Sequence, residues 1–206
     1  MRPAVHQVLA TLGYGDAIGH EVLGIQRVLR AAGYSSEIFV ETADPRLEHL
    51  TLDYRELPAA SHPDNLLIHH FSIGSRASRV AYALPDRMAL VYHNITPPEF
   101  FVDVHPLLVQ LCYLGRRELG VYANRVDLGL GDSEYNRAEL ESLGQVLDLA
   151  REERTAAGDR FPVLRRHPLG HVPEQIEHAN GARPEREAAD RRSALVAVLR
   201  LVQRRE

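Results

Sequence analysis

Short apolar runs alternate with segments of helical spacing over the first two-thirds of this chain. The apolar runs predict buried strands at residues 5–10, 37–41, 66–70, 88–92 and 126–130. Between them, spacings of three and four residues predict helices at 20–32, 76–83, 103–123 and 134–143. Strands that alternate with helices in this way form a parallel sheet. We therefore predict an α/β fold, a Rossmann-like parallel sheet with helices on both faces.

This alternation ends near residue 145. Residues 145–206 hold 12 of the 24 arginines, in less than a third of the length. A short strand at 161–164 and an apolar helix at 193–202 are open alternatives, while 165–187 is rich in Pro, Gly, His and Arg and resembles a loop or a disordered segment. We predict a Rossmann-like domain at 1–144 and an Arg-rich, irregular or partly helical tail at 145–206.

Composition narrows the class of protein. The chain is 45% hydrophobic and 25% charged with a net charge of −4, which argues against a nucleic-acid partner because no excess positive charge faces a phosphate backbone. The single cysteine, Cys112, excludes an internal disulfide and a cysteine-based zinc cluster, and its apolar setting favours a packed core thiol. No stretch approaches the roughly 20 apolar residues of a membrane span, and no signal-peptide core is present. We expect a cytoplasmic protein.

A glycine-rich turn follows the first predicted strand. Gly13, Gly15 and Gly19 would let backbone amides approach an anion where the next helix begins. The dinucleotide fingerprint requires its third glycine one residue earlier, and Glu41 is the candidate for the acid that ends the second strand. A ligand-facing loop and a tight turn that merely needs glycine remain the two alternatives.

His93 ends the strand at 88–92 and is the strongest single candidate. Ligands bind open α/β sheets at the carboxyl ends of the strands. Asn94 and Thr96 add polar groups, and Pro97 and Pro98 keep the segment out of a helix. The imidazole could donate a hydrogen bond to a hydroxyl or a carbonyl group. The alternative is a structural, hydrogen-bonded histidine.

The third predicted strand ends in a similar way at His69 and His70. Adjacent strand residues point to opposite faces, so this pair cannot chelate one metal ion, and we predict no metal site. Gly74 and Ser75 after the strand are candidate ligand contacts.

The last strand–helix junction carries Asp132, Ser133 and Asn136. There, Asp132 or Ser133 can cap the helix, or a hydroxyl can touch a substrate. No Gly-x-Ser-x-Gly elbow or cysteine–histidine pair indicates a nucleophile. The remaining basic residues are interpreted as solvated helix surfaces, with a peripheral membrane contact as the alternative: Arg76, Arg79, Arg116 and Arg117.

Several of these segments together resemble a known family. They occur in one order: the glycine loop with His20-Glu21, then Leu67-Ile68-His69-His70-Phe71-Ser72-Ile73-Gly74-Ser75, Tyr92-His93-Asn94-Ile95-Thr96-Pro97, and Gly131-Asp132-Ser133-Glu134-Tyr135-Asn136. Over residues 4–144 the chain is similar to the N-terminal domain of the group 1 (family 4) retaining glycosyltransferases of the GT-B fold.

The resemblance implies a function and a set of site residues. In such enzymes two Rossmann-like domains face each other across a cleft. They transfer a sugar from a nucleotide sugar to a glycan or lipid-linked acceptor, without an essential metal or other cofactor. It implies that His93 contacts the transferred sugar. It also implies a donor or sugar side at Gly13, Gly15, Gly19, Asn94, Thr96, Ser133 and Asn136, and an acceptor side at His70, Ser72, Gly74 and Ser75. We expect a role in cell-envelope or exopolysaccharide synthesis, with the inner face of the membrane as an alternative location.

The chain departs from the family after residue 144. The family's second domain supplies a basic pair for the diphosphate and two spaced glutamates for the donor. Glu177 and Glu185 have that spacing, but Gly181 and Pro184 lie between them. We therefore expect a truncated or out-of-frame terminus and a chain that does not turn over alone.

Two other functions remain as alternatives. One is a non-catalytic module that binds a sugar or a partner. The other is a nucleotide-dependent oxidoreductase, which the extra residue between Gly15 and Gly19 disfavours. The glycosyltransferase interpretation requires the early glycines and His93 to share one edge of the sheet, with the imidazole accessible rather than sealed inside.

Overall fold

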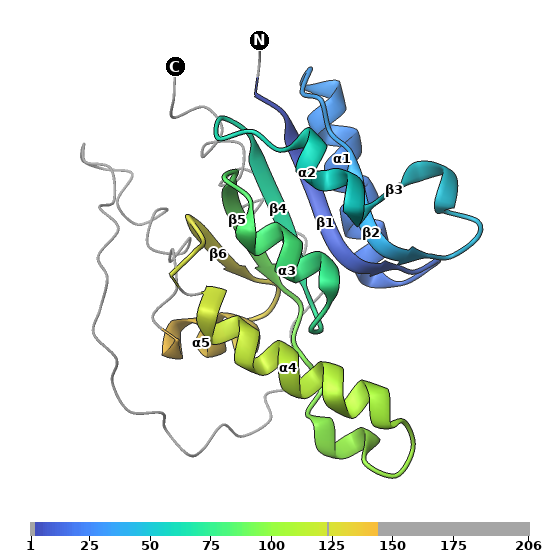
Figure 1. The fold of residues 1–206 in the computed structure, drawn as a ribbon, viewed down its shortest axis with the longest axis vertical. Helices are drawn as coiled ribbons and strands as arrows, with labels where there is room; N and C mark the ends of the chain where they lie inside the picture. The colour runs from blue at the N-terminus through green and yellow to red at the C-terminus, as the bar shows by residue number, and fades with distance from the viewer. Residues whose placement is uncertain (1–2, 123, 144–206) are drawn as a thin grey trace.

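The computed structural model of the chain describes residues 3–122 and 124–143. They form a six-stranded parallel sheet in the order β3-β2-β1-β4-β5-β6 (Figure 1). The strands are β1 (Val5–Leu12), β2 (Ile38–Ala43), β3 (Leu52–Asp53), β4 (Leu66–Phe71), β5 (Arg87–Tyr92) and β6 (Leu128–Gly131). The predicted α/β, Rossmann-like sheet is confirmed. The predicted tail at 145–206, with Glu177 and Glu185, lies outside the described residues.

Helices cover both faces of this sheet. The α-helices are α1 (Ala17–Ala31), α2 (Leu57–Ala60), α3 (Arg76–Ala83), α4 (Pro106–Tyr122) and α5 (Glu134–Ser142). Short 3-10 helices are η1 (Glu48–Leu50), η2 (Tyr54–Glu56) and η3 (Pro98–Phe101). α1 lies behind the sheet in Figure 1, while α3 and α4 lie in front of it. The layered arrangement is the one that the alternating pattern predicts.

The segment between β2 and β4 contains elements that the sequence pattern does not reveal. The strand β3 has 2 residues and α2 has 4 residues, so neither is long enough to show a period of its own. Elsewhere the predicted elements are present with shifted ends. Two helices shift by three residues at their starts. α1 begins at Ala17 rather than at residue 20, where Asp16 supplies its N-cap, and α4 begins at Pro106 rather than at residue 103. The prediction that Pro97 and Pro98 keep their segment out of a helix is wrong, because the 3-10 helix η3 begins at Pro98, a first-turn position where proline is tolerated.

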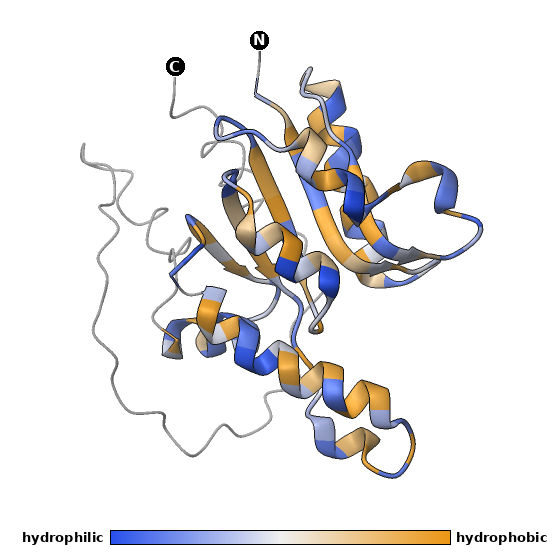
Figure 2. Ribbon diagram, in the orientation of Figure 1, coloured by the Kyte–Doolittle hydropathy of each residue, from blue (hydrophilic) through white to orange (hydrophobic). Residues whose placement is uncertain are grey.

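The core divides into one cluster on each side of the sheet and a third near β2. Leu57, Ala81, Leu119 and Leu140 bring α2, α3, α4 and α5 onto the same face. On the opposite face, α1 contributes buried Val22 and Leu29. Figure 2 shows apolar colour along the strands and mixed colours on the helices, the pattern of amphipathic helices on a buried sheet. Cys112 is a buried free thiol of this core, and burial raises its pKa.

The strand order determines where a ligand could bind. Chain connections run outward from β1 in both directions, so the order reverses between β1 and β4. In open parallel sheets the crevice outside the carboxyl ends of the strands at such a reversal is the usual ligand site. The loops after β1, β4, β5 and β6 all leave this edge, and they carry the glycine turn, Ser72–Ser75, His93 and Asp132.

Candidate functional site

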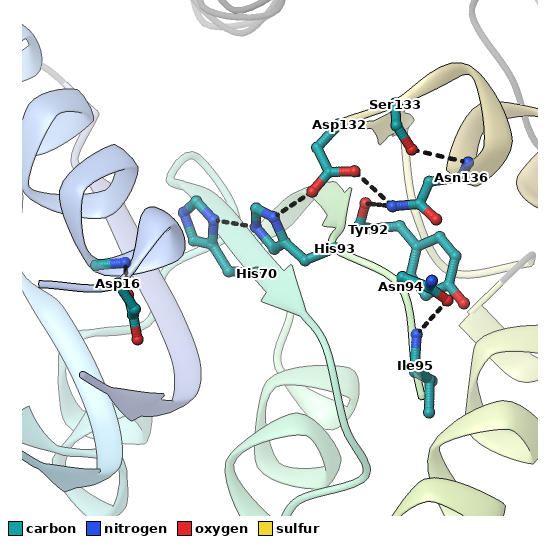
Figure 3. Close-up of polar contacts among 10 residues, drawn as sticks. Asp16, His70, Tyr92, His93, Asn94, Ile95, Asp132, Ser133 and Asn136 are labelled. Carbon is teal, nitrogen blue, oxygen red and sulfur yellow. Dashed lines mark hydrogen bonds and ion pairs between the residues drawn. The ribbon is translucent and has the colours of Figure 1, made fainter. Parts of the chain in front are cut away.

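A row of hydrogen-bonded side chains runs across the sheet from the interior of β1 to the carboxyl ends of β5 and β6. His70 Nδ1 lies 3.0 Å from His93 Nε2, and His93 Nδ1 lies 3.0 Å from Asp132 Oδ2 (Figure 3). On the other side, His70 Nε2 lies 3.0 Å from Gln7 Oε1, and Gln7 Nε2 donates to the Val22 carbonyl oxygen at 3.0 Å. The row therefore joins β1, β4, the end of β5 and the loop after β6.

The two rings meet edge to edge. The planes of His70 and His93 differ by 13° while their centroids are 5.3 Å apart, so the short nitrogen–nitrogen contact lies within the ring planes. Both rings are buried: the His93 side chain is only 2% exposed. Burial and the nearby His93 lower the pKa of His70 well below its ordinary value, so His70 is neutral.

His69 faces the other side of β4. Its Nε2 lies 3.1 Å from Ser78 Oγ, and its ring packs against Phe71 and Tyr122. Burial lowers its pKa to about 3. The prediction that His69 and His70 point to opposite faces is confirmed.

Asp132 is the open end of the row. Its side chain is 33% exposed, and its Oδ1 accepts a hydrogen bond from Asn136 Nδ2. The same Asn136 nitrogen lies 3.4 Å from the Tyr92 carbonyl oxygen, while its buried Oδ1 has no hydrogen-bond partner among the described residues. Ser133 caps α5 by accepting from the Asn136 backbone at 3.2 Å, so capping is its observed role.

The glycine turn carries its own anion. Asp16 caps α1 by accepting from the Gly19 backbone nitrogen, which is the position that a ligand anion would use. Gly19 is needed for close approach, because a Cβ there would lie 2.5 Å from the Gly13 carbonyl oxygen. Gly15 has φ +78. These glycines meet the needs of a tight turn, and contact with donor phosphates stays a prediction that the Asp16 carboxylate opposes.

The helix that follows β4 is also capped from within the chain. Glu41 Oε1 accepts from the Ala77 backbone nitrogen at 3.1 Å. The carboxylate of this candidate acid from the second strand therefore binds an amide in the first turn of α3. Ser75 caps the same helix through the Ser78 backbone at 2.9 Å. The carboxyl edge thus offers few open backbone amides to a phosphate.

The remaining predicted site residues have mixed settings. Gly74 is buried and donates its backbone N–H to the Leu111 carbonyl at 3.1 Å, while Ser72 is half-buried. Asn94 adopts φ 68, a left-handed conformation that asparagine tolerates, and its Oδ1 accepts from the Ile95 backbone at 2.7 Å. Thr96 is exposed. Only Ser72, Asn94 and Thr96 of these keep surface for a ligand.

Arg116 corrects the prediction of a purely solvated basic face. Its Nη1 pairs with Glu139 Oε1 at 2.7 Å, and its Nη2 donates to the Ile95 carbonyl oxygen at 2.5 Å. Tyr92 donates its hydroxyl to Glu139 Oε2 at 2.7 Å; burial of the Tyr92 side chain, and secondarily this bond, raises its pKa. Arg79 likewise pairs with Glu118 at 2.7 Å. Arg116 therefore fastens the segment after His93 to α4 and α5.

The structure brings part of the predicted site together. His70, His93 and Asn136 belong to one network, and Figure 3 places Asp16 of the glycine turn apart from it. Sequence reasoning missed Gln7 altogether and considered Asp132 only as a cap. A buried glutamine inside an apolar strand was the available signal for Gln7, because such a group requires a partner.

Among residues 3–122 and 124–143, no group of three or more His, Cys, Asp or Glu side chains is arranged to hold a metal ion. The helices described there are too short or too polar to cross a bilayer.

Neither a protein-family model, nor a curated protein, nor a solved structure matches the chain.

Proposed function

We propose that this α/β domain is the acceptor-side half of a retaining, nucleotide-sugar-dependent glycosyltransferase that acts in cell-envelope or exopolysaccharide synthesis. The observation that carries the proposal is the polar row Gln7–His70–His93–Asp132, which starts inside β1, crosses the strand-order reversal to β4 and ends at the carboxyl ends of β5 and β6. The segment from Tyr92 to Pro97, which resembles that family, leads directly out of this row.

The chemistry of this edge suits hydroxyl groups better than phosphates. Asp16 and Glu41 already occupy amides at the starts of α1 and α3, and Asp132 adds a third carboxylate. A diphosphate brought to these groups would meet like charge. The same argument disfavours the dinucleotide-dependent oxidoreductase, which needs pyrophosphate at the first helix. In the proposed enzyme, groups outside this domain neutralise the departing diphosphate.

The burial of His93 changes the role that we propose for it. With 2% of its side chain exposed and both nitrogens hydrogen-bonded, the ring has little surface for direct sugar contact. The requirement that the imidazole be accessible is therefore not met, and the proposal is supported by the resemblance of residues 92–97 and by the position of Asp132 at the carboxyl edge. We therefore assign His93 as a positioning residue behind Asp132. Direct contact between the His93 ring and the sugar stays a prediction.

A second candidate is a sugar-binding module without chemistry. It is favoured by the closure of the polar row, because each nitrogen of both rings already has a partner within the domain. The two candidates share the ligand and differ in turnover, so binding and transfer need separate measurements.

Binding is tested by recording backbone NMR spectra of the 206-residue chain with methyl glycosides and with nucleotide sugars. We expect shifts at residues 72–75, 93–96 and 131–133, after the carboxyl ends of the strands. Asn65, at the amino end of β4, serves as the internal reference and should not shift. Shifts confined to that opposite edge, or none with any sugar, would contradict the proposal.

Turnover is tested with radiolabelled nucleotide sugars and a mixed glycan and lipid-linked acceptor preparation. We expect the 206-residue chain alone to give no transfer, because Asp16, Glu41 and Asp132 at the described carboxyl edge are carboxylates and cannot neutralise a departing diphosphate. Transfer by this chain alone would show that it carries a complete donor site. Sugar binding that persists when a matching second domain is added in trans without any transfer would favour the non-catalytic module.

A further inference from the structure

The hydrogen bonds of the polar row require more protons than two neutral imidazoles carry. Three contacts link Gln7 Oε1, the two rings and Asp132 Oδ2 in series, and each contact needs one proton between its two atoms. A neutral imidazole has one N–H, so His70 and His93 together supply only two. The third contact is a hydrogen bond only if the pair of rings holds one additional proton.

Gln7 determines which atoms donate and which accept along the row. Its Nε2 donates to the buried Val22 carbonyl oxygen, so its Oε1 faces His70 and must accept. Turning the amide over would place two oxygens against each other at 3.0 Å in a buried site. His70 therefore donates from Nε2. Of the two buried rings, only His93 contacts a carboxylate of the described residues, so the additional proton resides on His93. His70 Nδ1 then accepts and His93 donates from Nε2.

Asp132 determines the other end in the same way. Asn136 Nδ2 donates to Asp132 Oδ1, and the Asp132 side chain is 33% exposed, the setting of an ionised carboxylate, which only accepts hydrogen bonds. Asp132 Oδ2 therefore accepts from His93 Nδ1. Both nitrogens of His93 donate, which makes the ring a cation.

Among the described residues, the titratable groups in contact with His93 come from β4 and from the loop after β6. These groups are His70 and Asp132, respectively. His69 lies on the other face of β4, and its buried ring is neutral. The Arg116–Glu139 pair belongs to the helices of that other face, and Asn136 from α5 carries no charge. Asp132 is thus the anion that balances His93.

We propose that His93 is held doubly protonated behind Asp132 and that Asp132 is the ligand-contacting residue, whose exposed carboxylate accepts hydrogen bonds from the hydroxyl groups of a sugar. The ligand class rests on the proposed function. Each Asp132 oxygen uses one lone pair within the row, which leaves acceptor capacity toward solvent. The cation behind the carboxylate keeps it ionised when a bound sugar excludes water, and its negative charge selects hydroxyls over phosphate.

The proton count is tested without any ligand by long-range ¹⁵N–¹H NMR of the histidine rings at pH 7. In the wild-type chain we expect both His93 nitrogens to be protonated and His70 to be protonated only at Nε2. Gln7→Met removes the acceptor that forces this direction, so one of the two rings' protons should be lost. Asp132→Asn, at the exposed end, provides a second variant if the buried substitution impairs folding, and it should also leave one His93 nitrogen bare. A bare His93 nitrogen in the folded wild type would overturn the assignment.

The ligand contact is tested by titrating wild type, Asp132→Asn and Asp132→Ala with methyl glycosides, and with inorganic phosphate as the comparison anion. Loss of charge-assisted hydrogen bonds should weaken glycoside binding by about tenfold or more, while phosphate binding should not weaken. Asp103→Asn, an exposed acid before α4, is the matched control and should leave binding unchanged. Equal glycoside affinity of wild type and Asp132→Asn would overturn the role of Asp132 alone. Absence of glycoside binding to the wild type would overturn the proposed function and this ligand class together, while the NMR result still decides the protonation of His93.

Discussion

Gly74 and Gly115 bring the loop after β4 into backbone contact with α4. A Cβ on Gly115 would lie 2.6 Å from the Gly74 nitrogen, and a Cβ on Gly74 would lie 2.8 Å from the Gly115 nitrogen. Neither neighbour is the end of a flexible side chain, so neither can move aside easily. This contact packs α4 against the loop after β4 and against Ile95, which lies in the segment that begins at His93.

Replacing Gly115 with alanine is expected to destabilise the protein by about 1 to 3 kcal/mol, because the methyl group would force the loop and α4 apart. The free energy of unfolding in urea measures this. Gly120→Ala in the same helix is the matched control, since nothing lies within 4 Å of its Cβ position. The control should be neutral or gain up to about 1 kcal/mol from helix propensity. Equal stability of the two variants would show that the contact is not tight.

Stability should fall as the pH is lowered from 7 to 5. Burial lowers the folded-state pKa of His6, His69 and His70, and that of His69 falls to about 3. Below pH 6.5 the unfolded chain binds protons at these rings while the folded chain does not. The contribution of these rings to the free energy of unfolding is therefore fully present above that pH and decreases below it. His69 by itself should contribute a loss of about 2 kcal/mol over this interval.

The contribution of His69 is isolated by His69→Leu. Urea unfolding of this variant at pH 7 and pH 5 should show a smaller pH dependence than the wild type, because one buried titrating group is gone. His49→Gln, at an exposed position, should retain the wild-type dependence. An unchanged slope in His69→Leu would mean that His69 takes up a proton in the folded state as readily as in the unfolded chain.

Arg116→Met should loosen the segment that follows His93. The variant loses the bond to the Ile95 carbonyl and the pair with Glu139, at a cost of about 1 to 2 kcal/mol for these half-exposed groups. Backbone NMR should show chemical-shift changes at residues 93–96 as well as lower stability. Arg117→Met, at the exposed neighbouring position, should change neither. Identical spectra for the two variants would show that Arg116 does not hold the segment after His93 in place.

Asp16→Ala should destabilise the protein by about 1 kcal/mol through loss of the N-cap of α1, while Asp16→Asn should retain most of the cap. The alanine variant also uncovers the Gly19 amide, so inorganic phosphate should bind it more tightly than it binds the wild type. Thermal unfolding and phosphate titration measure the two effects. Phosphate binding that is equal in both proteins would show that Asp16 does not compete for this position.

The local pattern of the sequence was enough to predict the main elements and their class. Apolar runs and helical spacing depend on neighbouring residues, and they located the strands beside His70 and His93 and the cap at Ser133. Alternation along a strand also predicted that His69 and His70 face opposite sides. The elements between β2 and β4 were not predicted, because two or four residues are too few to show a repeating apolar spacing.

Only the tertiary structure decided which side chains meet. Gln7 and His70 are 63 positions apart, and His93 and Asp132 are 39 positions apart. They became partners because the strands lie side by side in the order β1-β4-β5-β6, and this order depends on packing between distant segments. The burial of His93 and the attachment of Arg116 to Ile95 follow from the same lateral packing. Periodicity along the chain reports which face a residue takes, and it carries no information about the neighbour across the sheet.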